Sequence, residues 1–334
     1  MLLPNTSMIP YHKPPKLDDA TLQAFLSMAE DAVDTGRYTR GSLSQVLSER
    51  IAKHHGYEYA IPFGQATHAI AVLARWYRRQ RFRKMIVPAF TWPSTYVPFL
   101  WSDFDVRFCD IVRKTWLADT GDMIMDIDTL FCPVDTFGSV YDEMPLRGWR
   151  DTWIDSAQSF GSPWKNVDMN RVVSLSSTKV LTSAEGGILL TQDRDLVEFA
   201  KGIGRWYSRM SEFHAALGLA HWEGFKDNLE KKRLIAEEYR RRFPELQWQE
   251  IPIGTNHYAV AALVDSPANV RKDNPDWEFR DYYQSIVNEN DEFVGFGNGW
   301  DMGHLPNTEY VSRHILAFPS WPDLEIERIG ELKV

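Results

Sequence analysis

The amino-acid sequence predicts an α/β fold in which about seven strands form a mostly parallel sheet between helices. Short apolar runs alternate with segments of helical periodicity, as in layered α/β domains. Most of these runs lack a strict apolar–polar alternation, which is typical of strands that helices cover on both faces. The 334 residues, 44% hydrophobic and 25% charged, suit one large soluble domain and a smaller one.

Two helices are predicted before the first strand, over residues 17–35 and 42–55, because apolar side chains recur there at helical spacing. Gly36 fits the end of the first helix. The strands are predicted at residues 59–64, 85–90, 105–111, 129–137, 152–157, 171–177 and 186–192. Ligands of such sheets bind at the carboxyl ends of the strands, so polar residues at those ends are candidates for a site.

The second half of the chain is predicted to link this sheet to another unit. A long helical region, a strand, a helix and a glycine-rich loop are expected, in this order, at residues 210–242, 257–264, 277–287 and 295–304. We therefore predict a large domain over residues 1–240, which includes the N-terminal helices. A smaller C-terminal α+β domain is predicted over residues 241–334.

Charge and cysteine usage exclude several classes of protein. The net charge of −9 argues against nucleic acid held by a general basic field, and the basic run at 76–84 fits a solvated helix end. Cys109 and Cys132 lie in apolar runs, which favours reduced thiols and a cytoplasmic location. No apolar run approaches the ~20 residues that span a membrane, and the N-terminus lacks the pattern of a signal peptide.

One lysine stands in unusual surroundings. Lys179 lies in SLSSTKVLTSAEGG (174–187), among small hydroxyl residues and between two apolar runs, whereas a surface lysine usually lies among other charges. It is either an ordinary side chain or an amine held in a pocket for covalent chemistry.

Three further features lie at strand ends. Asp155 is expensive to bury unless it is paired, with Lys179 or with a protonated ring nitrogen of a cofactor; alternatively it caps the next segment. Segment 64–70 joins a strand to a helix, where free N–H groups bind an anion or are simply capped. Trp92 is either a core side chain or a stacking surface. Together, amine, carboxylate, aromatic face and anion-binding turn are the parts of a pyridoxal phosphate (PLP) site.

Seven motifs then lead to a family resemblance. They are GRYTRGSLSQVLSERIAKHHG, ATHAI, VPAFTWPST, IDSAQSFG, SLSSTKVLTSAEGG, RMSEFHAALGLAHW and LPNTEYVSRHILAFPSWPDL. From about residue 36 to 321 the chain resembles the sugar aminotransferases of the DegT/DnrJ/EryC1/StrS family, which are PLP enzymes of fold type I. The pairing of Asp-x-Ala-Gln with Lys…Glu-Gly-Gly at this spacing is the most specific part of the resemblance.

The resemblance implies a role for each matching residue. Lys179 forms a Schiff base with the cofactor and then moves the 1,3-proton as acid and base. Asp155 pairs with the pyridinium nitrogen, Gln158 lies near the phenolic oxygen, and Trp92 stacks on the ring.

The phosphate and the turn after the lysine have implied residues too. Ala66 and Thr67 hold the phosphate mainly through backbone N–H groups, together with Ser174, and Glu185 shapes the turn beyond the lysine. Tyr207 stands where the family has an Asn that reaches the phosphate from the neighbouring subunit. A homodimer with shared sites is therefore expected.

The chain departs from the family pattern at several positions besides Tyr207. Ser176 and Asp135 stand where many relatives have His, and His221 stands where the family has Gln. The smaller domain is also shorter than usual. Because these changes cluster where substrate approaches, they leave the acceptor open.

The function implied by the resemblance is ping-pong transamination. Glutamate or glutamine donates its amine, the cofactor passes through pyridoxamine phosphate, and a keto-sugar, linked to a nucleotide, accepts the amine. Local arginines must bind the diphosphate; candidates are Arg37, Arg40, Arg205 and Arg209. A cyclitol ketone as acceptor, and a catalytically silent PLP-binding sensor, remain alternatives. Sugar dehydratases of this fold carry His in place of the lysine, so Lys179 argues against that chemistry.

Overall fold

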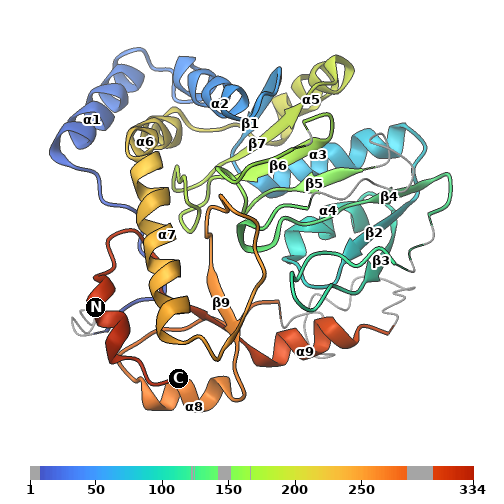
Figure 1. The fold of residues 1–334 in the computed structure, drawn as a ribbon. Helices are drawn as coiled ribbons and strands as arrows, with labels where there is room; N and C mark the ends of the chain where they lie inside the picture. Colours follow the sequence, from blue (N-terminus) through green and yellow to red (C-terminus); the bar gives the residue numbers. More distant parts are fainter. Residues whose placement is uncertain (1–7, 122, 124, 142–151, 166, 284–303) are drawn as a thin grey trace.

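The computed structural model describes residues 8–334 apart from 122, 124, 142–151, 166 and 284–303. Its larger layer contains a four-stranded sheet, in the order β1-β7-β6-β5, and a three-stranded sheet, in the order β3-β2-β4. Parallel bridges from Phe131 to Thr152 and from Val134 to Asp155 join β4 to β5, so the strands continue as one layer (Figure 1). Within it, only β7 runs antiparallel to its neighbours. The predicted mostly parallel sheet is confirmed.

The seven strands lie where the sequence predicts them, and each is shorter than expected; the largest difference is at the strand predicted over 129–137, of which only 129–131 form a strand. Their bounds are β1 Tyr59–Phe63, β2 Lys84–Pro88, β3 Asp105–Cys109, β4 Thr129–Phe131, β5 Trp153–Asp155, β6 Asn170–Ser174 and β7 Gly187–Thr191. The helices before them are α1 (Asp19–Asp34) and α2 (Ser42–His55). Asp18 caps α1 through the amide of Thr21, and Gly56 ends α2 with a left-handed φ of 78°.

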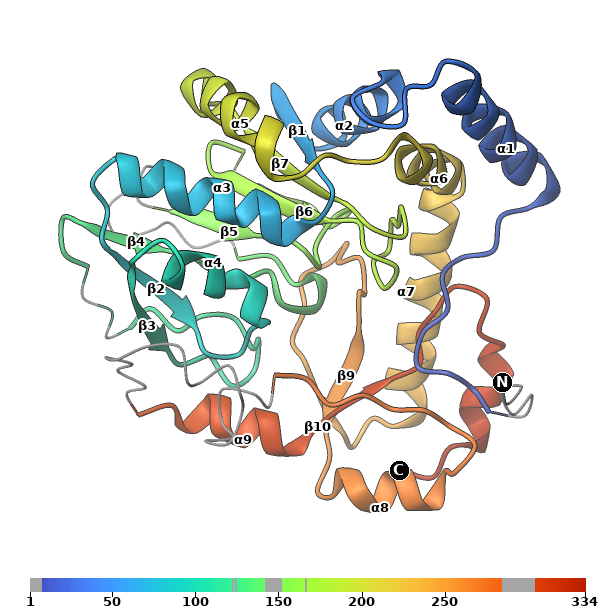
Figure 2. The ribbon, with the colours of Figure 1, turned by 180° about the vertical axis from the view of Figure 1, so that it is seen from behind.

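Helices cover both faces of the large sheet, as the apolar strands require. α3 (Ala66–Arg79), α4 (Val97–Leu100) and α5 (Arg194–Tyr207) lie on one face, which Figure 2 shows from the front. α2 and α6 (Glu212–Glu223) lie on the other, with α1 packed on α6 (Figure 1). Side chains of β6 alternate accordingly: Val172 packs in the core with α3, and Val173 packs with α2 and α6.

A second, smaller sheet has the order β10-β9-β8. α7 (Phe225–Arg242) runs from the large sheet to this small one (Figure 1). The remaining elements are β8 (Gln247–Trp248), α8 (Pro267–Asp273), β9 (Val260–Leu263), α9 (Pro306–His314), β10 (Ile315–Phe318) and the short 3₁₀ helices η1 (Pro93–Thr95), η2 (Thr136–Gly138) and η5 (Ile326–Glu331). The core of the small sheet includes Ile235 and Tyr239 of α7 and also Ile9 from the N-terminal segment. The division near residue 240 stays a prediction.

Two predictions about helices need correction, and one long helix was missed. The helical region at 210–242 is two helices, because α6 and α7 are separated at Gly224. α5 was not predicted. The helix expected at 277–287 is wrong over the described residues 277–283: Trp277 and Phe279 are buried while Glu278 and Arg280 are exposed, a period of two that belongs to extended chain.

Further sequence expectations concern loops, thiols and membranes. The glycine-rich segment 295–304 lies outside the described residues except for His304. Cys132 is buried, Cys109 is partly buried, and both are free thiols. In the described part of the chain, no helix has the length and apolar character needed to cross a membrane.

Candidate functional site

A cavity of about 310 Å³ lies between the large sheet and the small one. Segments that follow β1, β2, β5 and β6 line it, so it opens at the carboxyl ends of parallel strands. Seven of the eight predicted cofactor-site residues border this cavity: Ala66, Thr67, Trp92, Asp155, Gln158, Ser174 and Lys179. The structure thus brings together residues that span more than a hundred positions of sequence.

Lys179 follows β6 in a turn that its own amide closes by donating to the carbonyl of Ser176 at 3.0 Å. Its Nζ lies 4.6 Å from the centre of the Tyr258 ring. Burial tends to raise the pKa of Tyr258, but the nearby ammonium of Lys179 and hydrogen bonds bring that pKa below its ordinary value. The lysine is therefore a cavity side chain and not an ordinary surface charge.

Asp155 ends β5, and the residue is 5% exposed. Oδ2 accepts a 2.7 Å hydrogen bond from the hydroxyl of Thr95, and Oδ1 accepts a 3.0 Å bond from the amide of Ala157. Burial raises the pKa of Asp155, whereas these hydrogen bonds and the charge of Lys179 oppose the rise. The carboxylate does cap the segment that follows it, through the amide of Ala157, which was the alternative to a role at a cofactor. Among the described residues no cation forms an ion pair with it, so the protonated ring nitrogen of a cofactor fits this place.

The N-terminus of α3 meets the cavity at Ala66 and Thr67. Gln65, which precedes the helix, makes no side-chain cap, and within the described chain the amides of Ala66 and Thr67 have no hydrogen-bond partner. The hydroxyl of Thr67 donates to Ser94 at 3.0 Å. Free amides and the helix dipole suit an anion such as a phosphate.

Gly187 explains how α3 comes so close to the sheet. A Cβ atom at this position would lie 2.4 Å from both the N and Cα atoms of Ala66. Only glycine permits this approach, because no backbone contact is that short. Gly187 thus lets the start of α3 pack directly beside β7.

Trp92 and Gln158 present different surfaces to the cavity. Trp92 is 63% exposed, so the alternative that it is a core residue is excluded. Gln158 is buried; its Oε1 accepts from the amide of Phe137 at 2.8 Å, and its Nε2 lies 2.5 Å from the hydroxyl of Tyr283. The tryptophan offers a flat apolar face, and the glutamine offers a fixed polar group.

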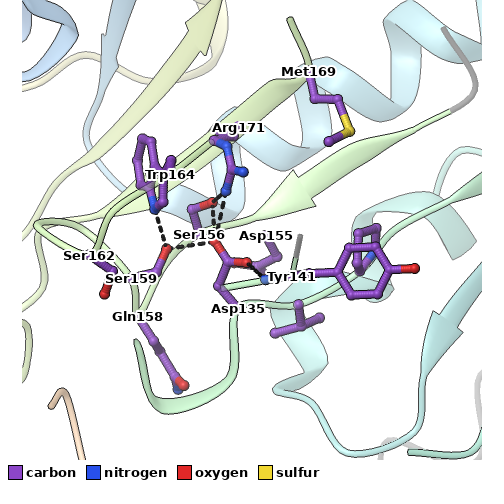
Figure 3. Close-up of polar contacts among 12 residues, drawn as sticks. Asp135, Tyr141, Asp155, Ser156, Gln158, Ser159, Ser162, Trp164, Met169 and Arg171 are labelled. Carbon is purple, nitrogen blue, oxygen red and sulfur yellow. Dashed lines mark hydrogen bonds and ion pairs between the residues drawn. The ribbon is translucent and has the colours of Figure 1, made fainter. Parts of the chain in front are cut away.

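The positions that depart from the family pattern lie in different places. Ser176 lines the cavity. Tyr207 is the last residue of α5, and its side chain is not among those described. His221 is buried in α6, and burial lowers its pKa. Asp135 is fully buried and forms a 2.8 Å ion pair with Arg171 (Figure 3).

The candidate arginines do not gather at this cavity. Arg40 and Arg209 line a separate cavity of about 330 Å³ beside β1, and Arg37 lines another of about 400 Å³ near α1. The side chain of Arg205 lies outside the described set. In this structure none of the three described arginines borders the cavity of Lys179 and Asp155.

Sequence reasoning missed the wall that the small sheet provides. It consists of Tyr258, Arg280, Tyr282 and Tyr283. The guanidinium of Arg280 lies 5.2 Å from the ring of Tyr11, whose hydroxyl is 2.9 Å from that of Tyr282. The aromatic run around 282 was visible, but its assignment to a helix hid which of its side chains face a cavity.

Known proteins share this fold. The structure of DesI in the presence of its TDP-sugar product superposes with a TM-score of 0.85 at 20% identity, covering 98% of this chain and 91% of DesI. The GDP-4-keto-6-deoxy-D-mannose-3-dehydratase of E. coli with bound hydrated PLP gives a TM-score of 0.83 at 17% identity, covering 96% and 97%. At these identities the likeness establishes the α/β fold that these enzymes have in common.

Sequence comparison gives the family. GDP-perosamine synthase of Escherichia coli O157:H7 is 24% identical over 237 residues, which are 62% of this chain and 65% of that enzyme. The chain spans about half to two thirds of the length of the curated relatives that it matches. The model of the DegT/DnrJ/EryC1/StrS aminotransferase family matches residues 20–332. Since that match takes in nearly the whole sequence, the chain belongs to the DegT/DnrJ/EryC1/StrS aminotransferase family.

Proposed function

We propose that this chain is a PLP-dependent aminotransferase that moves an amino group from glutamate or glutamine to a nucleotide-linked keto-sugar. The observation that carries the proposal is the presence of Lys179 and the buried Asp155 in one cavity, beside uncapped amides at the start of α3. Family membership agrees with it. These groups match the three demands of the cofactor: an amine, a carboxylate and an anion site.

PLP, when bound, supplies a protonated ring that withdraws electrons from the substrate carbon. Asp155 holds the proton on the ring nitrogen, because its buried carboxylate has no cation of its own among the described residues. The amine of Lys179 holds the cofactor and then carries the proton between the two substrate atoms. Both roles need the amine and the carboxylate in the same cavity, where burial strengthens the interaction between charges.

The other predicted residues fix the position of the cofactor. Amides of Ala66 and Thr67, together with the hydroxyl of Ser174, bind the phosphate. The exposed face of Trp92 stacks on the ring, and the remaining N–H of Gln158 donates to the phenolic oxygen. Gln158 is buried and held by hydrogen bonds, so it keeps one orientation.

Arg280 is the group that we assign to the carboxylate of the amino donor. It and Lys179 are the two cations among the described residues that line the cavity, and in the described chain no carboxylate pairs with Arg280. Its backbone is fixed by two hydrogen bonds with Ala317, at 3.0 and 3.1 Å. A guanidinium that lines a cavity on a fixed backbone, without an ion pair among the described residues, suits bidentate binding of a carboxylate.

The acceptor and its nucleotide are proposed from the relatives. GDP-perosamine synthase and DesI carry GDP and TDP in their names, so a nucleotide-linked sugar is the common feature. The base and the sugar of this chain's own acceptor are open. A cyclitol ketone remains the alternative acceptor, since the described cavity has no group that demands a diphosphate.

A homodimer is proposed as the active form. Side chains of α1 and α2 leave apolar groups exposed, among them Leu22, Leu26, Val33 and Val46. A second copy would cover such a patch, and Tyr207 of one chain would then reach the phosphate of the other. We place the enzyme in the cytoplasm on account of its free thiols.

The test is an absorption spectrum of the purified protein with PLP, recorded before and after L-glutamate or L-glutamine. We expect a band of bound cofactor that the amino acid converts to that of pyridoxamine phosphate, and Lys179→Ala must abolish this change. A bound cofactor that no amino acid converts would favour the silent sensor. A cofactor band unchanged in Lys179→Ala would overturn the role of the lysine. Keto-sugar nucleotides and cyclitol ketones are then compared as acceptors.

A further inference from the structure

The turn at residues 155–159 has two sides. Asp155 and Gln158 line the cavity, whereas the hydroxyls of Ser156 and Ser159 point away from it and donate to Asp135, at 2.9 and 2.6 Å (Figure 3). Asp155 and Gln158, which we propose to hold the cofactor ring, therefore belong to a turn whose other side is hydrogen-bonded to Asp135.

Asp135 accepts more hydrogen bonds than most side chains can. Its Oδ2 accepts from Ser156, Ser159 and Nη1 of Arg171, and its Oδ1 accepts from the amide of Tyr141 at 2.9 Å. Three of these donors share Oδ2, an arrangement that the negative charge of a carboxylate favours, whereas a neutral imidazole could accept from only one donor. An aspartate at this position can therefore bind Ser156, Ser159 and Arg171 together.

The Asp135 carboxylate needs Arg171, because a buried carboxylate is stable only when it is paired with a cation. Both side chains are 0% exposed and lie 2.8 Å apart. Nη1 of Arg171 also donates to Ser156 at 2.7 Å, and the guanidinium lies 4.6 Å from the ring of Trp164. The cation thus fixes the carboxylate and one of the two serines at once.

The segment after β4 also binds the turn at 155–159 through backbone amides. The amide of Asp135 donates to the carbonyl of Asp155 at 3.0 Å, and the amide of Phe137 donates to Gln158 at 2.8 Å. Backbone and side chain of this one segment therefore contact both faces of the turn. A shift of Asp135 moves both cavity groups together.

We propose that Asp135, held by Arg171, is a positioning residue: by fastening Ser156 and Ser159 it sets where Asp155 and Gln158 stand against the cofactor ring. This inference rests on the proposed function, since it assumes that PLP binds in the cavity. Asp135 itself is not among the residues that line the cavity.

The experiment removes the donors and leaves the ion pair in place. Ser156→Ala, Ser159→Ala and the double variant are compared with Ser162→Ala, a buried hydroxyl that donates to Gly138 at 2.7 Å and does not contact Asp135. The dissociation constant for PLP and the pH titration of the bound cofactor's absorption are measured beside Tm. We expect the double variant to raise the dissociation constant about tenfold and to shift the titration. Ser162→Ala lowers Tm alone.

A second pair of variants covers the charges. Asp135→Asn leaves the buried Arg171 without its ion-pair partner and is expected to fold poorly. Asp135→Asn with Arg171→Met removes both charges, and it should recover Tm without recovering the affinity for PLP. Native affinity and titration in the double serine variant would overturn the positioning role alone. Failure of the unaltered chain to bind PLP would overturn the proposed function and this inference with it.

Discussion

The hydroxyl of Thr95 donates to Oδ2 of Asp155 at 2.7 Å, inside a cavity where that carboxylate has no ion-pair partner among the described residues. A hydrogen bond to the ionised form favours ionisation, whereas burial opposes it and raises the pKa. The threonine belongs to the segment after β2, and the aspartate ends β5. The segment after β2 therefore helps to decide whether the carboxylate at the end of β5 stays charged.

Thr95→Val is expected to weaken the ionised form of Asp155. Hydrogen bonds to charged groups contribute about 1.5–3 kcal/mol, so activity should fall about 10- to 100-fold at neutral pH. The acid limb of the pH–rate profile should move to higher pH, because the pKa of Asp155 rises further. Thr91→Val is the control, since Thr91 contacts the hydroxyl of Thr95 and not the carboxylate. An unmoved acid limb would count against the pairing.

Asp155→Asn is expected to separate activity from stability. Since the folded pKa of this carboxyl is raised, its contribution to stability is largest below the unfolded pKa and is lost as pH rises through the folded pKa. Above that range the cofactor-free Asn variant should melt higher than the parent, while its amino-transfer rate should fall at least ~100-fold. Thermal melts from pH 3 to 8 check the first outcome; a lower Tm for the variant at pH 7 contradicts it.

Arg280→Ala should impair the donor half-reaction selectively. Loss of a bidentate partner for the donor carboxylate raises KM for glutamate, by about 10- to 100-fold, and Arg280→Lys should recover part of that loss. Single-turnover rates with the keto-sugar should change little. Binding of glutarate to the cofactor-free protein gives a readout without catalysis. Equal losses in both half-reactions would show that Arg280 does not distinguish the two substrates.

Gly187→Ala should separate α3 from β7. The new Cβ would meet backbone atoms of Ala66, which cannot move without displacing the helix N-terminus. We expect a loss of about 1–3 kcal/mol in the free energy of unfolding and a weaker affinity for PLP. Gly202→Ala is the control, because that glycine lies on α5 with nothing within 4 Å and should stabilise the protein slightly. Denaturant titration measures both.

Lys232 should give the protein a pH-dependent stability. Burial lowers its pKa to about 7 from an unfolded value of 10.5. Between these values the unfolded chain binds more protons, so stability rises with pH, at most by ~1.4 kcal/mol per unit. Lys232→Met should flatten this slope; Lys231→Met, at an exposed neighbour paired with Asp323, should not. Tm from pH 7 to 10 is the measurement.

Sequence reasoning found the half of the cavity that has local motifs. Lys179, Asp155 and the start of α3 lie at strand ends, where apolar runs stop at polar residues, so their place in the sheet was predictable. The wall with Tyr258 and Arg280 carries no such pattern. Its side chains reach the cavity only because a short extended segment pairs with β10, which depends on tertiary contacts.

The ion pair under the turn was out of reach for another reason. Asp135 was recognised as a departure from the family, but nothing local connects it to Arg171, which lies on another strand. On β6, Arg171 faces Asp135 and the next residue, Val172, faces α3. The register of β6 in the sheet therefore decides whether Arg171 can pair with Asp135. Sequence periodicity gives the alternation of a strand but not the neighbour that its side chains meet.

The N-terminal segment ties the cavity wall to contacts that are very distant in sequence. The hydroxyl of Tyr11 forms a hydrogen bond with that of Tyr282 across 271 positions of sequence, and Ile9 forms a β-bridge with Trp277, so the N-terminal segment contacts a distant part of the chain beside the cavity wall. Contacts between residues this distant in sequence form slowly, because a long loop must lose conformational entropy before the contacts stabilise it. The large sheet can assemble from nearer neighbours while the wall that carries Arg280 is still open. We therefore expect the large sheet to form before the cavity closes.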